Sequence, residues 1–354
     1  MASKDPTEIA ELKINGALFR DWTSVSVTQQ FAKWHPLFSF DCTEEFPLKK
    51  SAALLQIKPG DVVEVLLAGQ LAVSGYVLER HVGYDARQHG VKIAGAGKTW
   101  DLTNTSVFEQ SGSFDGKNIA QLAQALIGPS GCGLQLRGAV DLTPFKNIQV
   151  SPGEIISQCI ERYARMRKVV LGSTETGDLL LIGDHAAVPS ATLVEGKNIL
   201  RANALLDDQH IWSKVYAINQ RTSDDETNGD KANKQIAMVT GSSTRNRTLV
   251  VPCDVSDDDH GVRQRAEMEK IFTEGGKLEA HITVQGWLNG GKLWKAGEYY
   301  DVNAPMLMLY GQTLGAMSVT FEQDSARGTT TTLVMVDPQH MAGRPDMRTA
   351  PGAQ

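Results

Sequence analysis

The chain has 354 residues and a mass of 38.5 kDa, more than one hydrophobic core usually serves, so two or three domains are expected. Hydrophobic residues make up 41% and charged residues 21% of the sequence, which excludes collagen, coiled coils and wholesale disorder. With a net charge of −6, the chain lacks the excess of basic residues that binds nucleic-acid phosphates. The sequence also has no membrane-spanning apolar run, and residues 1–13 lack the apolar core of a secretory signal.

The first hundred residues predict short β-strands separated by glycine turns. Asn15-Gly16 lies between two apolar runs, and this dipeptide favours a two-residue hairpin because both turn positions need a positive φ. Residues 24–28 alternate between polar and apolar side chains with a period of two, as a half-buried strand does. Further strands are expected at residues 61–68, 71–80 and 91–94.

The middle of the chain predicts a small α/β unit. Residues 118–127 place their apolar side chains on one helical face, and Gly128-Pro129 ends that helix. A second helix is expected to begin at Ser151-Pro152-Gly153-Glu154, which has the sequence of a capping box with proline at the first helical position. A hairpin over residues 169–182, with its turn at Thr176-Gly177, completes the unit.

The last third returns to strands. Residues 211–220 and 278–288 are expected strands. The second alternates strictly, and its apolar side carries Leu278, Ala280, Ile282 and Val284. Between them, residues 222–247 are polar and predict a long mobile loop, and residues 256–259 cap a helix that ends near 275–276. Residues 339–354 predict a disordered C-terminal tail.

An internal repeat links the two strand-rich parts. Lys58-Pro59-Gly60-Asp61 and the strand after it resemble Lys295-Ala296-Gly297-Glu298 and its following strand. In both copies a second strand, an Asp/Arg turn and a third strand follow in the same order. Chance remains an alternative, because antiparallel meanders share turn chemistry. If the repeat is real, the chain contains two similar β-barrels, and heterologous contacts could close copies of such a chain into a ring.

No catalytic, cofactor-binding or metal-binding residue can be assigned from the sequence. Gly95-Ala96-Gly97-Lys98-Thr99 resembles the end of a phosphate-binding loop, but it lacks the earlier glycine and an obvious following helix. Asp257-Asp258-Asp259-His260 could suggest a metal, although helix capping accounts for these contiguous acids. The cysteines lack C-x-x-C spacing and predict a chain made without structural disulfides in a reducing cytoplasm; they are Cys42, Cys132, Cys159 and Cys253.

The order of several segments resembles the baseplate hub proteins of Mu-like contractile-tailed phages, which are related to the spike hubs of type VI secretion. The similar segments span about residues 9–338, and they are Leu12–Thr28, Val91–Leu102, Val150–Arg167, Gly177–Leu179, Gly196–Leu200, Val284–Trp287 and Leu293–Gly297. The resemblance implies a mainly β (α+β) chain with two similar β-barrel tube-type domains and a small α/β domain between them. The expected bounds are 1–104 for the first barrel, 105–190 for the α/β domain, 191–338 for the second barrel with its 222–247 loop, and 339–354 for the tail.

The resemblance also implies a structural, non-enzymatic role in the virion. Three copies would form a pseudo-sixfold ring that joins the hexameric tail tube, or a tube-initiator protein, to the trimeric central spike. Baseplate wedge proteins would surround the ring, phage DNA would pass through it without specific binding, and assembly would take place in the cytoplasm of the bacterial host. The alternatives are a tail-associated cell-wall hydrolase and a carbohydrate-binding β module. The expected hub regions leave no extra domain over for a hydrolase, and a carbohydrate-binding module leaves the repeat and the middle unit unexplained.

Overall fold

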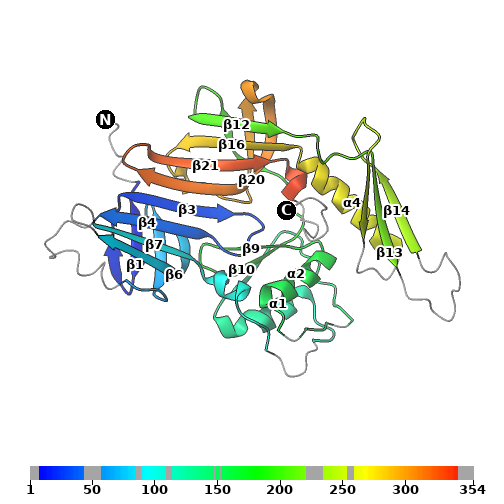
Figure 1. Ribbon diagram of the computed structural model, residues 1–354, viewed down its shortest axis with the longest axis horizontal. Coiled ribbons are helices and arrows are strands. Elements are labelled where there is room, and N and C mark those ends of the chain that lie inside the picture. The colour runs from blue at the N-terminus through cyan, green and yellow to red at the C-terminus, as the bar shows by residue number, and fades with distance from the viewer. Residues whose placement is uncertain are drawn as a thin grey trace. The chain divides into compact units, whose positions relative to one another are not determined.

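The computed structural model describes residues 8–43, 57–84, 89–108, 114–146, 148–151, 153–220, 234–252 and 259–341. It contains two compact units, one made of Met1–Asn203 and His281–Met335 and the other of Ala204–Ala280 and Val336–Gln354. Strands predominate over helices, so the expected mainly β (α+β) class is confirmed (Figure 1). No helix among these residues is long and apolar enough to cross a membrane.

A single large sheet contains the strands of both halves of the repeat. Its first half comprises β1 (Ala10–Ile14), β2 (Ala17–Phe19), β3 (Ser24–Gln30), β4 (Leu37–Thr43), β5 (Val62–Leu67), β6 (Gln70–Tyr84) and β7 (His89–Gly97). Its second half comprises β11 (Pro189–Val194), β12 (Arg201–Leu206), β16 (Leu278–Gln285), β19 (Tyr299–Ala304), β20 (Leu309–Asp324) and β21 (Gly328–Val336). The strands follow the order β12-β16-β21-β20-β3-β4-β7-β6-β5-β1-β2, of which the part from β12 to β7 can be followed in Figure 1. Strand β19 pairs with both β20 and β11.

The predicted Asn-Gly hairpin is confirmed. Strands β1 and β2 pair antiparallel with Ile14 opposite Ala17, so only Asn15 and Gly16 form the turn. Their φ values are +50° and +81°, the left-handed conformation that this turn requires. The apolar face predicted for β16 is confirmed at Ala280, Ile282 and Val284, which are buried, whereas Leu278 is only partly buried and Thr283, on the polar face, is buried as well.

The strand order shows that the internal repeat is structural. The path β3-β4-β7-β6-β5 matches the path β12-β16-β21-β20-β19, strand for strand. The same pair of backbone hydrogen bonds marks each copy: Gly60 donates to Val77 (2.8 Å) and Val77 to Asp61 (3.0 Å), as Gly297 donates to Ala316 (2.8 Å) and Ala316 to Glu298 (2.9 Å). These contacts make Gly60 equivalent to Gly297 and Val77 to Ala316, so turn chemistry alone does not explain the similarity. We call the two five-strand paths repeat 1 and repeat 2.

Between the repeats lies the predicted α/β unit. It contains β8 (Leu134–Arg137), β9 (Val170–Ser173), β10 (Leu179–Ile182), α1 (Ile119–Ile127) and α2 (Ile156–Met166), with short 3-10 helices at Lys98–Thr103 and Gly128–Ser130. Strand β10 pairs antiparallel with β9, which confirms the expected hairpin, and parallel with β8. Both helices pack on a core that includes Leu122, Ile127 and Cys159, all fully buried. The prediction that Cys159 is a small core residue is therefore confirmed.

Helix α2 begins later than the sequence predicts. Ser151 and Glu154 do form the reciprocal contact of a capping box, since the Ser151 N–H donates to Glu154 Oε2 at 3.0 Å. However, Gly153 has a φ of +79°, outside the helical region, and Ile155 forms an isolated β-bridge with Ser106. Ser151 and Glu154 therefore belong to a turn before the helix, and the helix begins at Ile156, five residues beyond Ser151.

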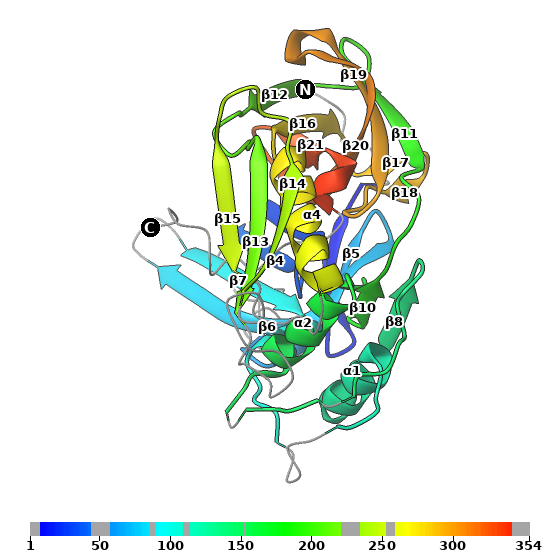
Figure 2. The same cartoon turned by 90° about the vertical axis from the view of Figure 1, so that its right-hand side faces the viewer.

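The second unit contains a small sheet that was partly predicted as loop. Strands β13 (Lys214–Gln220), β14 (Lys234–Thr240) and β15 (Thr248–Pro252) pair in the order β14-β13-β15, and α4 (Asp259–Gly275) packs on them (Figure 2). Strand β14 lies within the expected 222–247 loop, so that expectation is wrong for residues 234–240; residues 221–233 lie outside the described residues. The predicted helix end near Gly275 is confirmed.

The remaining short elements are β17 (Leu288–Asn289), β18 (Lys292–Leu293), and 3-10 helices at Pro305–Leu307 and Pro338–Met341. The last of these lies in the second unit, where the His340 ring stacks on Phe272 with centroids 4.2 Å apart. The start of the expected disordered tail is therefore ordered at residues 339–341, and residues 342–354 lie outside the described residues. The domain bounds near 104, 190 and 338 stay a prediction, as does the closure of each repeat into a barrel.

Candidate assembly site

The two repeats are joined edge to edge by strands β3 and β20. The strands pair antiparallel from Ser318 opposite Gln30 to Asp324 opposite Ser24. Just beyond that register, the Phe31 N–H donates to the Met317 carbonyl oxygen at 2.7 Å, and the hydroxyls of Thr28 and Thr320 lie 3.2 Å apart. Because every backbone group of an extended strand is a possible pairing point, this contact turns two sheets into one. We call it the internal joint.

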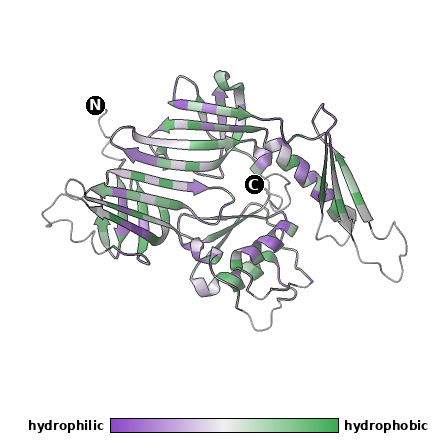
Figure 3. Cartoon of the chain, in the orientation of Figure 1, coloured by the Kyte–Doolittle hydropathy of each residue, from purple (hydrophilic) through white to green (hydrophobic). Residues whose placement is uncertain are grey.

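One side of the internal joint is apolar and buried. Val27 and Phe321 lie opposite each other across the two strands, and neither side chain is exposed to solvent. Val25 and Val319 extend this layer along the same strands. Full burial of such side chains contributes about 1.5–3 kcal/mol each, so the layer is a substantial source of stability at the joint. Figure 3 shows the resulting alternation of apolar and polar residues along these strands.

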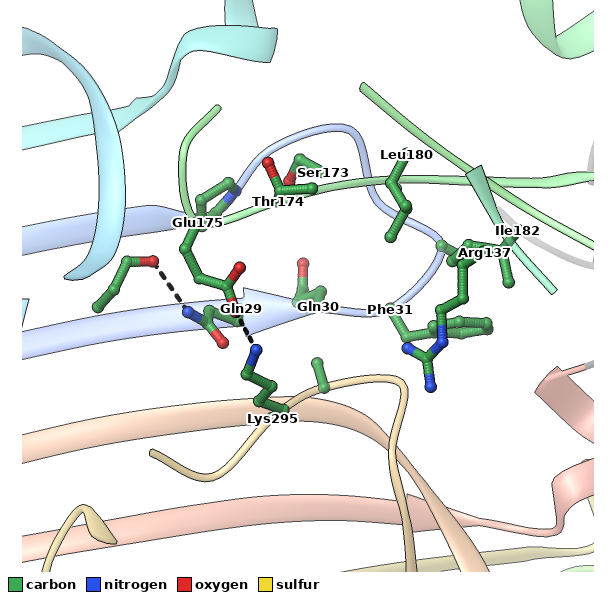
Figure 4. A pocket seen from close by; sticks show the side chains of 15 residues that line it. Gln29, Gln30, Phe31, Arg137, Ser173, Thr174, Glu175, Leu180, Ile182 and Lys295 are labelled. Carbon is green, nitrogen blue, oxygen red and sulfur yellow. Dashed lines mark hydrogen bonds and ion pairs between the residues drawn. The ribbon is translucent and has the colours of Figure 1, made fainter. Parts of the chain in front are cut away.

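A small cavity lies at the end of the internal joint (Figure 4). Its volume is about 70 Å³, enough for a few water molecules. Across it, Lys295 Nζ of repeat 2 lies 2.7 Å from Glu175 Oε1 of the α/β unit. Arg137 donates to the Gly297 carbonyl oxygen at 3.0 Å. Because these charged side chains bind one another or the backbone, the cavity has the character of a structural junction.

The opposite side of the sheet is polar. In repeat 1 the face carries small and charged side chains from four strands, and we call it the polar face: Ser24, Ser26, Thr28, Ser39, Asp41, Glu79, His81, Lys92 and Ala94. It continues through Thr320 and Glu322 into repeat 2, where the hydroxyls of Thr283 and Thr332 lie 3.1 Å apart. An open groove of about 670 Å³ runs over its repeat-1 part. Lys92 is outnumbered there by Asp41 and Glu79, so this part of the face has no basic character.

The segment that resembles a phosphate-binding loop, Gly95–Thr99, has a structural role. Gly95 and Gly97 lie within β7, and a Cβ atom on Gly95 would lie 2.2 Å from the Tyr76 carbonyl oxygen. Thr99 is fully buried, and its hydroxyl donates to the Trp34 carbonyl oxygen. A 3-10 helix follows instead of the longer helix that a phosphate site needs. These residues therefore close repeat 1 onto the α/β unit.

The structure gives the other candidates ordinary roles. Among the described residues no group of His, Cys, Asp or Glu side chains has the arrangement of a metal site. Asp259 begins α4, whereas Asp257 and Asp258 lie outside the described residues, as does Cys253. Cys132 and Cys159 are buried free thiols, and Cys42 is also buried. Burial raises the pKa of Cys159 to about 11, with the nearby Glu154 carboxylate adding to the effect.

Comparison with known proteins identifies the family. Residues 9–97 match the family model described as Mu phage baseplate assembly protein GpP-like, N-terminal, and residues 99–183 match baseplate hub protein gp44-like, second domain. The chain is 24% identical over 303 residues to baseplate hub protein gp44 of Escherichia phage Mu, which covers 83% of this chain and 78% of that protein. The chain is a homologue of Mu gp44 that carries GpP-like and gp44-like baseplate hub domains.

Solved structures of related proteins extend this relationship. The 43 kDa tail protein of prophage MuSo2 from Shewanella oneidensis is 25% identical, with a TM-score of 0.82 over 95% of this chain and 100% of that chain. The E. coli c3393 protein, a component of the type VI secretion system, shares the fold at 8% identity, with a TM-score of 0.58 over 95% of this chain and 79% of that one. This baseplate hub protein is therefore a component of the phage virion tail.

Sequence reasoning found the repeat of this hub protein but missed the internal joint. The joint involves β3 and β20, which lie almost 300 residues apart, and no local pattern predicts which strand edges meet. The only available signal was the alternation of Ser24 to Thr28, which matches the alternation of Val319 to Glu322 on its partner.

Proposed function

We propose that three copies of this hub protein form a pseudo-sixfold ring at the centre of the baseplate. The observation that carries the proposal is the internal joint, because it places two equivalent five-strand paths side by side within one chain. Three such chains supply six similar sheets, while the chain itself repeats only three times. A ring of this kind can meet a hexameric partner on one face and a trimeric partner on the other.

The partners follow from this symmetry. The tail tube, or a tube-initiator protein, would bind one face of the ring, and the trimeric central spike would bind the other. Wedge proteins of the baseplate would surround the ring, and assembly would take place in the cytoplasm of the bacterial host. Support comes from the E. coli type VI component with the same fold, which is described as structurally similar to the T4 tail proteins gp27 and gp5.

We assign the polar face to the lumen of the ring, through which phage DNA would pass. The face presents short hydroxyl side chains and more acidic than basic groups over repeat 1, including Asp41, Glu79 and Lys92. Phosphate binding requires clustered basic side chains that release counterions, and this face offers too few for tight binding. DNA could therefore slide past it without being held.

The proposed role is structural and not enzymatic. Support comes from the relatives, which are baseplate hub proteins, and from two structural contacts: Thr99, in the segment that resembles a phosphate loop, binds the Trp34 carbonyl oxygen, and Lys295, at the cavity, binds Glu175. A zymogram in which the purified chain lyses bacterial cell walls would contradict this part of the proposal. Specific binding to a cell-surface glycan would favour the carbohydrate-binding alternative instead.

The ring is tested by measuring the mass of the purified chain with multi-angle light scattering and imaging the particles by electron microscopy. Three chains of 38.5 kDa give a particle of about 116 kDa, and its images should show a central hole surrounded by six similar lobes. A chain that stays monomeric at the highest soluble concentration, or a closed dimer, would overturn the proposal.

A further inference from the structure

Several strand edges of the described structure have no strand partner, and two of them belong to β12 and to the far half of β6. Strand β12 ends the order of the large sheet, with β16 on one side and no described strand on the other. Strand β6 pairs with β5 only over Gln70–Tyr76, so Leu78–Tyr84 are paired on the β7 side alone. Unpaired edges of this length are ready templates for another strand, and proteins usually cover or blunt them.

The internal joint shows what each edge fits. Repeat 2 uses the far half of β20 to bind β3, and the counterpart of that half in repeat 1 is the far half of β6. Likewise, β12 occupies in repeat 2 the position that β3 occupies in repeat 1. The pair β3–β20 therefore has one missing counterpart, β12–β6, and a single chain cannot form it because β3 already joins the two repeats.

Burial along β6 agrees with a missing partner. Counting from the equivalent Val77 and Ala316, Val82 corresponds to Phe321 and Arg80 to Val319. Phe321 is fully buried beneath the internal joint, whereas Val82 is 50% exposed. The buried Nε and Nη2 atoms of Arg80 have no hydrogen-bond partner among the described residues. An apolar side chain left half-exposed beside an unsatisfied guanidinium is typical of a surface that another chain covers.

The free edge of β12 is equally suited to pairing. Just before the strand, the Leu200 N–H donates to the Thr283 carbonyl oxygen at 2.8 Å, as the Thr23 N–H before β3 donates to Asp41. Just after the strand, the Asp207 N–H donates to the Lys277 carbonyl oxygen at 2.9 Å. Because successive residues of a strand direct their N–H groups to opposite sides, counting back from Asp207 leaves Ala202, Ala204 and Leu206 with N–H groups directed away from β16. Leu205 is also 64% exposed, which makes the edge apolar as well as unpaired.

We infer that β12 of one copy pairs with the Leu78–Tyr84 half of β6 in the next copy, which repeats the internal joint between chains. This inference rests on the proposed ring and names the strands that close it. The contact is heterologous, since each copy offers β12 on one side and β6 on the other. In the ring, three internal joints would alternate with three joints between chains, and the polar face would become continuous around the lumen.

Two proline variants of the full chain test the inference, each designed to remove one outward N–H. Ala204→Pro acts on β12, because the Ala204 N–H is directed away from β16. Val82→Pro acts on β6, because Val82 is equivalent to Phe321, whose backbone faces β3, and so Val82 faces the missing strand. Proline is tolerated on edge strands when its nitrogen faces solvent. Val82→Lys is the second β6 variant in case the proline disturbs β6, since an edge lysine also opposes pairing. Circular dichroism and thermal melting should show that each variant is folded.

The expected results concern the oligomeric state of each variant alone and of an equimolar mixture of the two. Each variant alone should lose the trimer and run as a monomer, because every joint needs one intact β12 and one intact β6. An equimolar mixture should form a one-to-one dimer and stop there, since only one compatible pair of edges remains. The matched control is Leu18→Pro on β2, at the other end of the sheet. Ile14 and Ala17 form a hydrogen-bonded pair, so in the next pair, Lys13 and Leu18, the Leu18 N–H is directed away from β1. It should leave the trimer intact.

The outcomes separate this inference from the proposed ring. If wild type is trimeric and both folded variants remain trimeric, the ring stands and the assignment of its edges is wrong. If one variant alone forms a stable dimer, a two-fold contact between identical edges replaces the heterologous joint, and the inference also fails. If wild type itself is monomeric at its highest soluble concentration, both the ring and the joint are overturned.

Discussion

Replacing Ile282 and Val284 by aspartate together is the sharpest test of how the β16 strand faces the core. Ile282 is fully buried and Val284 is 2% exposed. Losing the burial of the two side chains costs about 1.5–3 kcal/mol each. Placing two unpaired carboxylates there adds several kcal/mol for each charge. The total is about 10 kcal/mol or more, comparable with the whole stability of about 5–15 kcal/mol that domains usually have.

The assay is the yield of soluble chain followed by thermal melting monitored by circular dichroism. The double variant should be insoluble or lack a cooperative transition. The matched control is His281→Asp, which introduces a carboxylate between the two positions but on the exposed face, where water hydrates the charge, and it should lower stability far less than the double variant does. A soluble double variant that melts like wild type would show that the assigned facing of β16 is wrong.

Three further predictions concern single residues. Gly75→Ala should lower the free energy of unfolding in urea by about 2 kcal/mol or more, because a Cβ atom there would lie 1.9 Å from the Ala96 carbonyl oxygen. Gly83→Ala is the control in the same strand, because a Cβ atom there meets nothing within 4 Å, and it should leave that free energy unchanged. Cys159, with a pKa of about 11, should resist thiol reagents at pH 8 until the chain unfolds, as peptide mass spectrometry would show; rapid native labelling would contradict its burial. Asp178→Asn should cost about 1 kcal/mol at pH 7 and nothing at strongly acidic pH, measured by urea unfolding at both.

The sign of the Asp178 prediction follows from its environment. Burial alone would raise the pKa of this carboxyl group, but hydrogen bonds from Thr176, Gln135 and Gly133, together with Lys98, outweigh it and lower the pKa. A carboxyl group whose folded pKa lies below its unfolded value stabilises the fold above that unfolded value, and the contribution disappears as pH falls through the folded pKa. An effect that persisted unchanged in strong acid would mean that charge is not its source.

Sequence patterns predicted the elements that depend only on residues close together in the chain. The Asn15-Gly16 turn depends on two residues that accept a positive φ, and the alternation in β16 reflects one buried face, so both were visible in short windows. The start of α2 was misplaced because the left-handed φ of Gly153 and the bridge from Ile155 to Ser106 override a capping-box sequence. The second of these constraints is tertiary, so the window around Ser151 could not reveal it.

The small sheet of the second unit was missed for a different reason. Strand β14 packs Ala237 and Val239 against the core of that unit, while Ile236 and Met238 on its other side are about half exposed. Both faces are therefore apolar, and the polar residues before the strand dominate the composition of the 222–247 window. The apolar run of four residues within this seven-residue strand, Ile236 to Val239, has no period-two signal to separate it from a loop that contains a few hydrophobic residues.

The position of the second unit in the chain bears on the symmetry of the proposed ring. In repeat 1, β3 and β4 are joined by a short connection of six residues, Phe31–Pro36. In repeat 2 the equivalent strands are β12 and β16, and the connection between them carries β13, β14, β15 and α4. The insertion adds a folded unit to every second sheet of a six-sheet ring. The sheets would then present sixfold-like edges to one another, while the insertions would occur with threefold symmetry. A protein that joins a hexameric tube to a trimeric spike needs both symmetries, and this one insertion between two strands is sufficient to distinguish the two kinds of sheet.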